Sequence, residues 1–382
     1  MTESRWRVPL SDVIVDDELA EAALEVIRSG WWSMGPRVAE LEQEFADFCG
    51  ARHAVAVDSG TAALHLALLA VGCGLGDEVV VPSLNFVAAA NTIVNTGAEP
   101  VFCDILGPDE LNLDPADVEA AVGPRTRAVV TLHYGGFPCA MDAVDELAER
   151  HGLAVVEDAA HAPGASLGGR MCGTLGRVGC FSFFANKNLP VGEGGMVLTN
   201  EDELAERLRL LRSHGMTTLT WDRHRGHASS YDVVAPGFNY RLDELRATVA
   251  LVQLRRLPDE NAARGRIAAR YREGLDGEAG LALPFRLGNE HRKSSHHLAV
   301  VVLPEGTDRD ALRAELADSG IQTSVHYPPI HAFTQYRAAG SRRPLPRTDA
   351  VAPRLLTLPL YGRMSDEQAD AVVEALLGAL RR

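Results

Sequence analysis

One lysine in a glycine-rich segment is the residue of this chain best suited to covalent chemistry. Lysine and arginine together number 37, and only Lys187 and Lys293 are lysines. Lys187 lies in Ser182-Phe-Phe-Ala-Asn-Lys-Asn-Leu-Pro-Val-Gly-Glu-Gly-Gly, an apolar run followed by glycines. Arginine matches lysine as a cation, but its guanidinium stays protonated and cannot form an imine. Lys187 is therefore a candidate for amine chemistry, although composition alone favours an incidental residue.

Two other motifs follow predicted strands, where an open parallel sheet binds its ligands. Asp58-Ser-Gly-Thr-Ala62 joins a strand to a helix, and a glycine with exposed N–H groups at a helix N-terminus suits a phosphate. Asp158 ends the buried run Val155-Val-Glu-Asp, where a charge is costly unless a cation or hydrogen-bond donors compensate it. Taken singly, the first motif is more often a plain helix cap, and for Asp158 a cap is an equal alternative.

Together the three motifs match the needs of one cofactor, pyridoxal 5'-phosphate (PLP). This cofactor requires an anion cradle for its phosphate, an acidic partner for its pyridine nitrogen and a lysine for its aldehyde. An aspartate beside that nitrogen favours the protonated ring, which then accepts electrons. The order and placement of the motifs therefore predict a PLP enzyme.

Short valine-rich runs alternate with helical patterns between residues 54 and 199. This alternation predicts βαβ units and an α/β fold with a three-layer, doubly wound, mostly parallel sheet. The predicted strands are 54–57, 78–81, 100–103, 128–132, 153–156, 180–183 and 196–198.

The pattern changes in the last third of the chain. Helices are predicted at 201–213 and 241–257, then a strand at 297–303, a helix at 308–317 and a strand at 322–326. Ser365 and Gln368 can form a capping box at the start of the last helix. We expect a large PLP-binding domain over 1–245, whose N-terminal segment lines the substrate site, and a smaller α/β domain over 246–382.

Composition limits the classes of partner. A net charge of -15 and a pI near 5.3 argue against nucleic acid or an anionic membrane as the main partner. The six cysteines form no CxxC pair and are expected to be reduced core thiols. The N-terminus has no apolar leader, and no stretch is long enough to span a bilayer, so we expect a cytoplasmic protein. No metal site is expected, because His296 and His297 lack suitably spaced partners.

The chain resembles the DegT/DnrJ/EryC1/StrS family of sugar aminotransferases, PLP enzymes of fold type I (aspartate aminotransferase-like), over nearly its whole length. The motifs that carry the resemblance are Gly30-Trp-Trp-Ser-Met-Gly-Pro36, Ser59-Gly-Thr-Ala-Ala-Leu64, Pro82-Ser-Leu-Asn-Phe86, His133-Tyr-Gly135, Glu157-Asp-Ala-Ala-His161, the segment 182–195, Gly237-Phe-Asn-Tyr-Arg-Leu-Asp243 and His326-Tyr-Pro-Pro-Ile-His331. Residues 183–186 depart from the commoner His/Tyr-Pro-Thr/Gly pattern, which leaves the lining beside Lys187 open.

The resemblance implies a role for each cofactor residue. Lys187 would be the catalytic residue and hold the cofactor as an imine, and Asp158 would pair with its pyridinium nitrogen. The phosphate would be held by Gly60, Thr61, Ala62 and Ser182, with Asn239 reaching the phosphate of the neighbouring subunit of a homodimer. Phe86 would stack on the ring, although an isolated phenylalanine is more often a core residue. His161 replaces the glutamine of many relatives and could contact the phenolic oxygen, whereas taken alone it is more often structural.

The resemblance also implies the reaction. It would transfer an amino group from L-glutamate to a nucleotide-linked, dTDP-type 4-keto-6-deoxysugar, by ping-pong kinetics through pyridoxamine phosphate. The motifs place substrate-binding residues at Trp32, Met34, Arg241, His326, Tyr327 and His331. A polar segment at 221–230 is either a loop over the site or a plain surface loop.

Several alternatives to this function remain. A 3-keto sugar could be the acceptor instead. PLP-dependent sugar dehydratases resemble these enzymes too, but they carry His at the position of Lys187. A regulatory homologue without turnover fits poorly with the joint presence of Lys187, Asp158 and Asn239.

Overall fold

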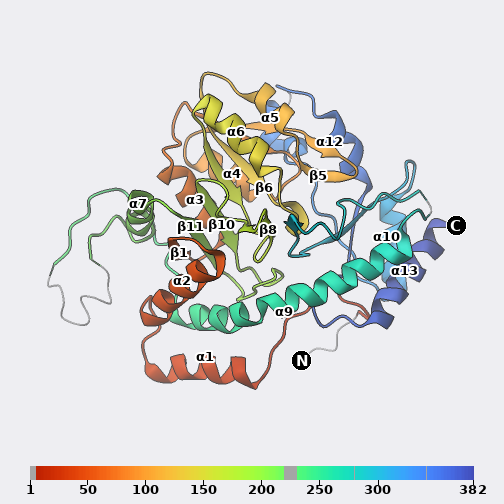
Figure 1. The fold of residues 1–382 in the computed structure, drawn as a ribbon, viewed down its shortest axis with the longest axis horizontal. Coiled ribbons are helices and arrows are strands. Elements are labelled where there is room, and N and C mark those ends of the chain that lie inside the picture. The colour runs from red at the N-terminus through yellow and green to blue at the C-terminus, as the bar shows by residue number, and fades with distance from the viewer. Residues whose placement is uncertain (1–5, 219–229, 279, 341) are drawn as a thin grey trace.

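The structure is a computed structural model, and it describes residues 6–218, 230–278, 280–340 and 342–382. At its centre lies a seven-stranded sheet in the order β1-β11-β10-β7-β6-β2-β3 (Figure 1). The strands are β1 (His53–Val57), β2 (Glu78–Pro82), β3 (Glu99–Cys103), β6 (Thr126–Leu132), β7 (Ala154–Asp158), β10 (Val178–Ser182) and β11 (Gly195–Thr199). β11 runs antiparallel to β1 and β10, and the other pairs are parallel. The predicted fold class is confirmed, strand by strand.

Helices cover both faces of this sheet because alternate strand residues point to opposite sides. Val55 and Val57 of β1 pack into one core, whereas Ala54 and Ala56 pack into the other. The first core is covered by α3 (Gly60–Ala70), α4 (Ala88–Asn95) and α7 (Asp202–Arg212). The second is covered by α2 (Pro36–Cys49), α5 (Pro115–Ala121), α6 (Met141–His151) and the first half of α9 (Glu244–Leu275). This is the predicted three-layer arrangement.

A smaller group of elements packs around the far end of α9. It comprises the antiparallel pair β13 (Ala299–Val302) and β14 (Leu355–Leu358) with α10 (Arg309–Asp318) and α13 (Asp366–Leu380). Figure 1 shows α9 running from α1 (Asp17–Ser29) and α2 to α13. The proposed boundary at 245/246 falls in the first turn of α9. The first half of this 32-residue helix packs into the second core of the central sheet, and its second half packs into the core of the smaller group.

The predicted strand at 322–326 is wrong. The partner of β13 is β14, and the segment touches β14 through a bridge between Ser324 and Thr357, with N–O distances of 3.1 and 2.8 Å. Pro328 and Pro329 follow, and neither has an N–H to extend a ladder. The capping box of Ser365 and Gln368 at the start of α13 is confirmed.

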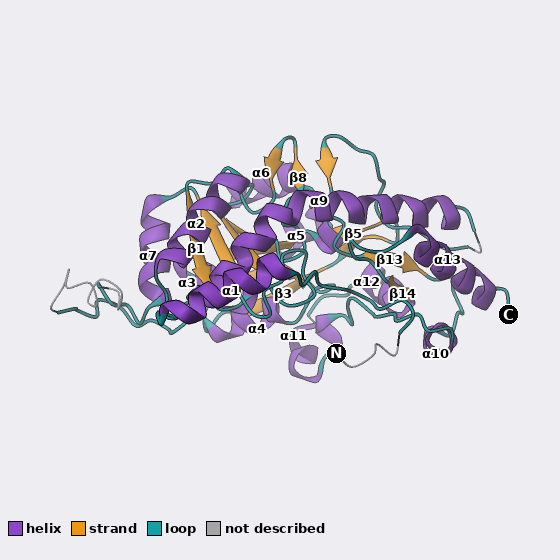
Figure 2. Ribbon diagram, turned by 90° about the horizontal axis from the view of Figure 1, so that it is seen from below, coloured by secondary structure: helices purple, strands orange, loops and turns teal. Residues whose placement is uncertain are grey.

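Short elements complete the fold. β4 (Ile105–Gly107) pairs with β5 (Glu110–Leu113), and α11 (Arg337–Gly340) and α12 (Pro346–Val351) lie in the C-terminal segment. β8 (Ser166–Leu167), β9 (Arg170–Met171) and β12 (Arg292–Lys293) form a small sheet that projects from one edge of the molecule (Figure 2).

All six cysteines are free and buried, as predicted. Among the described residues, no helix combines the length and the apolar character needed to cross a membrane.

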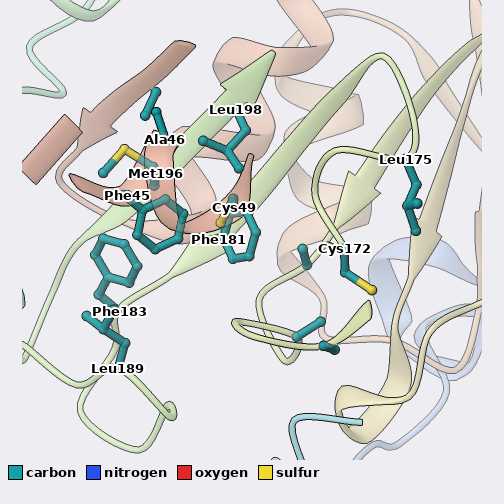
Figure 3. Packing of buried hydrophobic residues seen from close by; sticks show 14 of the residues in the cluster. Phe45, Ala46, Cys49, Cys172, Leu175, Phe181, Phe183, Leu189, Met196 and Leu198 are labelled. Atoms are coloured by element: carbon teal, nitrogen blue, oxygen red, sulfur yellow. The ribbon is translucent and has the colours of Figure 1, made fainter. Parts of the chain in front are cut away.

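Aromatic packing fixes the strand that leads to Lys187. Phe45 of α2 meets Phe181 and Phe183 with ring centroids 5.0 and 5.6 Å apart, both edge to face (Figure 3). Phe183 and Leu189 are fully buried, so they anchor the chain on either side of residues 184–188. Residues 184–188, which include Lys187, therefore form a short loop that is anchored at both ends by buried side chains.

The first residue of α3 must be small. A Cβ added to Gly60 would lie 2.6 Å from the Ser182 Cβ, because α3 begins directly against the end of β10. Real Cβ atoms do not approach so closely, so a side chain here would push the helix off the sheet.

We therefore expect Gly60→Ala to lower the free energy of unfolding by about 1–3 kcal/mol, through overpacking. Gly378→Ala is the matched control, since Gly378 also lies in a helix but faces open space. It should raise stability by about 0.5–1 kcal/mol, because alanine loses less backbone entropy. Urea unfolding followed by circular dichroism measures both. Ser182→Gly should restore the Gly60→Ala chain, and a Gly60→Ala chain as stable as the parent would contradict the steric argument.

Candidate active site

A cavity of about 370 Å³ opens at the carboxyl ends of β7 and β10, beside the start of α3. Its wall combines a cation, carboxylates, hydroxyls and aromatic rings. The lining residues are Ser59, Gly60, Thr61, Leu64, Asn85, Phe86, Ala88, Asp158, Ala160, His161, Cys180, Ser182, Phe184, Asn186, Lys187, Glu193, His326 and Tyr327. Nine of the residues predicted from the sequence lie here together: Gly60, Thr61, Phe86, Asp158, His161, Ser182, Lys187, His326 and Tyr327.

Strand alternation decides which acidic residue faces the cavity. Asp158 pairs in register with Cys180, and both line the cavity on the α3 side of the sheet. Glu157 points to the opposite side, where it accepts from the N–H groups of Gly173, Leu175 and Gly176 at 2.7–2.8 Å and contacts the His133 Nε2 at 2.8 Å. Glu157 is fully satisfied by structural donors, so Asp158 is the carboxylate left for a ligand.

The start of α3 forms an anion cradle. The first N–H groups of a helix have no partner within the helix. Here the Ser59 Oγ accepts from the Ala62 N–H at 3.1 Å, which leaves the Gly60 and Thr61 N–H groups for a ligand. The Ser182 hydroxyl lies against Gly60 at the same point. Two N–H groups, a hydroxyl and the positive end of the helix dipole suit a phosphate.

Lys187 lines this cavity. Burial lowers the pKa of Lys187 to about 8, and the charge of Asp158 opposes part of that shift. A lysine with such a pKa is partly neutral near pH 8, and its free amine can act as a nucleophile and as a base.

Asp158 is a buried carboxylate in need of a cationic partner. Its Oδ1 accepts from the Ala160 N–H at 3.2 Å, and it is 5% exposed. Burial raises the pKa of Asp158, while the Ala160 N–H and the Lys187 charge oppose the rise. A protonated ring nitrogen placed here would stabilise the ionised carboxylate.

His161 and Tyr327 form a hydrogen-bonded pair in the cavity wall. The Gly135 N–H donates to the His161 Nδ1 at 3.3 Å, so in the neutral ring the proton lies on Nε2. Nε2 then donates to the Tyr327 hydroxyl at 2.8 Å, which leaves the Tyr327 O–H as a donor. Burial holds the pKa of His161 well below its usual value, and the Lys187 charge adds to this. The same two causes lower the pKa of His326 to about 4.

Phe86 is a wall residue of the cavity. Its side chain is 54% exposed, and its ring centroid lies 5.8 Å from that of Tyr327. The interpretation of Phe86 as a core aromatic is therefore wrong. An exposed aromatic face at the rim of a polar cavity is suited to stack on a flat ligand.

The other predicted site residues lie outside this wall. Asn239 and Trp32 are exposed, Met34 belongs to the core, and Ala62 is buried within α3. Arg241 is half-buried, and its Nη1 has no hydrogen-bond partner in the described part of the chain.

His331 does not line the described wall. His331 is held by Ser83 at 2.6 Å and Asp349 at 2.9 Å. Residues 221–229 of the predicted loop lie outside the described residues. Within the described residues, no cluster of three or more His, Cys, Asp or Glu side chains could hold a metal ion.

Sequence reasoning missed several wall residues. Phe184 and Asn186 belong to the segment whose unusual composition left the lining open, and both line the cavity. The Asn186 Oδ1 is buried and has no partner among the described residues. Asn85 directly precedes Phe86, and Glu193 stands in the glycine run after Lys187, so proximity to known motifs was the available signal. Cys180 follows from its register opposite Asp158.

The wall fits PLP. The contact between Gly60 and Ser182 shapes a cradle for a phosphate, and Asp158 offers a buried carboxylate that pairs with no cation among the described residues. Lys187 supplies an amine of lowered pKa in the same cavity, and Phe86 supplies an aromatic face. These are the groups that the cofactor requires of its protein.

Comparisons with known proteins agree with this chemistry. The model of the DegT/DnrJ/EryC1/StrS aminotransferase family matches residues 13–377. The chain is 43% identical to the spore coat polysaccharide biosynthesis protein SpsC of Bacillus subtilis (strain 168) over 376 residues, covering 97% of this chain and 96% of that one.

Solved structures show the same likeness. DesV of S. venezuelae, solved in complex with a ketimine intermediate, is 40% identical with a TM-score of 0.90, over 98% of this chain and 99% of that chain. The aminotransferase TlmJ of Streptoalloteichus hindustanus is 39% identical, with the same TM-score and coverage. The chain therefore belongs to the DegT/DnrJ/EryC1/StrS family of PLP-dependent enzymes and is a sugar aminotransferase.

Proposed function

We propose that this enzyme transfers the amino group of L-glutamate to the C4 ketone of a dTDP-linked 4-keto-6-deoxysugar, forming an amino sugar for polysaccharide or antibiotic biosynthesis. The observation that carries the proposal is the presence of Lys187, Asp158 and the α3 cradle in one cavity. The name of SpsC, which places that relative in polysaccharide biosynthesis, supports a sugar acceptor.

The proposed cofactor contacts follow the wall of the cavity. The phosphate is assigned to the Gly60 and Thr61 N–H groups and the Ser182 hydroxyl, with the Ala62 N–H shared with Ser59. Asp158 keeps the pyridine nitrogen protonated, and Phe86 covers the ring. His161 is assigned to the phenolic oxygen. When bound, PLP supplies an electron-accepting ring that stabilises negative charge at the substrate carbon.

Lys187 moves the proton in both half-reactions. Its neutral amine takes the proton from the glutamate Cα, and in the second half-reaction it returns a proton to the sugar carbon that gains nitrogen. The lowered pKa makes the neutral form available near pH 8. His161, His326 and His297 stay neutral there, since burial and the nearby Lys187 charge lower the pKa of each.

The substrate is proposed to contact His326 and Tyr327. Both line the cavity and carry hydrogen-bonding groups, whereas Trp32, Met34, Arg241 and His331 do not line its described wall. A 3-keto sugar is the alternative acceptor.

We also propose a homodimer with shared sites. Asn239 is exposed and lies outside the cavity of its own chain. Tyr231, Val233 and Val234, a few residues earlier in the chain, are exposed too, and such a segment suits contact with a second subunit, where Asn239 could reach the partner's phosphate.

Replacing the amine while keeping the charge tests the role of Lys187. Lys187→Arg should lower kcat by about 100- to 10,000-fold, because a guanidinium neither forms an imine nor transfers this proton. Lys293→Arg is the matched control, since Lys293 is exposed and paired with Glu290, and its kcat should not change. Formation of 2-oxoglutarate measures both, and an active Lys187→Arg enzyme would refute the proposed mechanism.

The acceptor is tested with purified sugars. The dTDP-4-keto-6-deoxysugar and its 3-keto isomer are supplied separately with glutamate, and NMR locates the new amine. We expect turnover with the 4-keto sugar and an amine at C4. Preference for the 3-keto isomer would overturn the C4 assignment, and no turnover with either would reject the nucleotide-sugar proposal.

A further inference from the structure

Asn188, directly after Lys187, is buried behind the cavity wall and uses its whole amide group. Its Nδ2 donates to the Asn261 Oδ1 at 2.8 Å and to the Ser295 carbonyl at 2.7 Å. Its Oδ1 lies 2.9 Å from the His297 Nδ1, which must carry a proton because an amide oxygen only accepts. Asn188 is 5% exposed and does not line the cavity.

Asn261 extends these bonds from helix α9. Its Nδ2 donates to the Pro163 carbonyl at 2.9 Å, two residues after His161. A Cβ added to Gly164 would lie 2.7 Å from this Nδ2, so a glycine there lets the chain come this close to α9. Asn261 thus joins the lysine segment to the segment that carries His161.

Ser295 and His297 close the connection. The Ser295 Oγ donates to the His161 carbonyl at 2.7 Å. The His297 ring lies 4.5 Å from the His161 ring. The segment 295–297 therefore contacts both the residue after Lys187 and His161 itself.

We propose that the Asn188–Asn261 pair is a positioning device that holds the Lys187 backbone at a fixed distance from His161 by tying both to α9. Lys187 has a long side chain, so its amine is only as well placed as the backbone that carries it. Breaking one bond of a satisfied buried amide leaves an unpaired polar group, which loosens the segment. The inference rests on the proposed role of Lys187, but neither asparagine touches the cavity.

Because Lys187 and Lys293 are the two lysines of the chain, amine labelling can test the positioning role. The cofactor-free chain is labelled briefly with an amine-selective acylating reagent across a pH series, and mass spectrometry compares Lys187 with the exposed Lys293. In the parent chain, Lys187 labelling should have a midpoint near pH 8. Asn261→Leu and Asn188→Ala should each move that midpoint upward, toward the ordinary lysine value of 10.5, because water reaches a loosened amine. None of these variants replaces Asp158, so the charge that opposes the lowered pKa of Lys187 is kept in all of them.

Turnover gives the second measurement. Each variant should lower kcat about 10- to 100-fold through misplacement of the amine, with KM for glutamate within about threefold. In the double variant the two losses of kcat should be less than multiplicative, because the Asn188–Asn261 bond is removed in both single variants. Gln253→Leu is the matched control, since Gln253 is a buried amide on α9 whose Nε2 has no partner in the described residues.

An unchanged midpoint and kcat in both single variants would overturn the positioning role, as would an equal shift in Gln253→Leu. An active Lys187→Arg enzyme would reject the proposed function instead, while the labelling midpoints would still report on the asparagine pair.

Discussion

Burial of the Lys187 amine beside Asp158 is the interaction on which the rest of the site depends. An ammonium and a carboxylate removed from water lose hydration, and their attraction offsets only part of that loss. The result is an amine with a pKa of about 8 and a carboxylate with a raised pKa. Both groups therefore suit a ligand that reacts with the amine and places a positive charge beside the Asp158 carboxylate.

The fold supplies this arrangement through strand direction and alternation. Parallel strands β7 and β10 bring Asp158 and Ser182 to the same edge of the sheet, where α3 begins. Alternation turns Glu157 away, to be bonded by the N–H groups of three residues. Phe45 packs against Phe181 and Phe183 on the other face of the sheet and holds the end of β10 in place. The loop that carries Lys187 therefore begins at an anchored residue.

Much of this could be predicted from the sequence because it depends on local patterns. Short valine-rich runs that alternate with helical patterns predicted the seven strands, and the capping residues predicted the start of α13. The order of the cradle, the aspartate and the lysine predicted one cavity, since the carboxyl ends of parallel strands meet at one edge.

What could not be predicted depends on contacts between distant residues. Residues 322–326 have a strand-like composition, but β14 takes the place beside β13, and 322–326 continue to carry His326 and Tyr327 into the cavity. The helix predicted to end at 257 continues as α9 through Pro258 to Leu275, because its first half packs against the central sheet and its second half packs against β13, β14 and α13. The bond between Asn188 and Asn261 joins residues 73 apart in the chain, and no local motif marks it.

The most direct measurement of the central claim is to trap the cofactor on its amine. The chain is mixed with PLP, reduced with borohydride and digested, and mass spectrometry maps the phosphopyridoxyl group. The account predicts the group on Lys187, with much less of it when glutamate is added before reduction. A group on Lys293, or none on Lys187, would contradict the account.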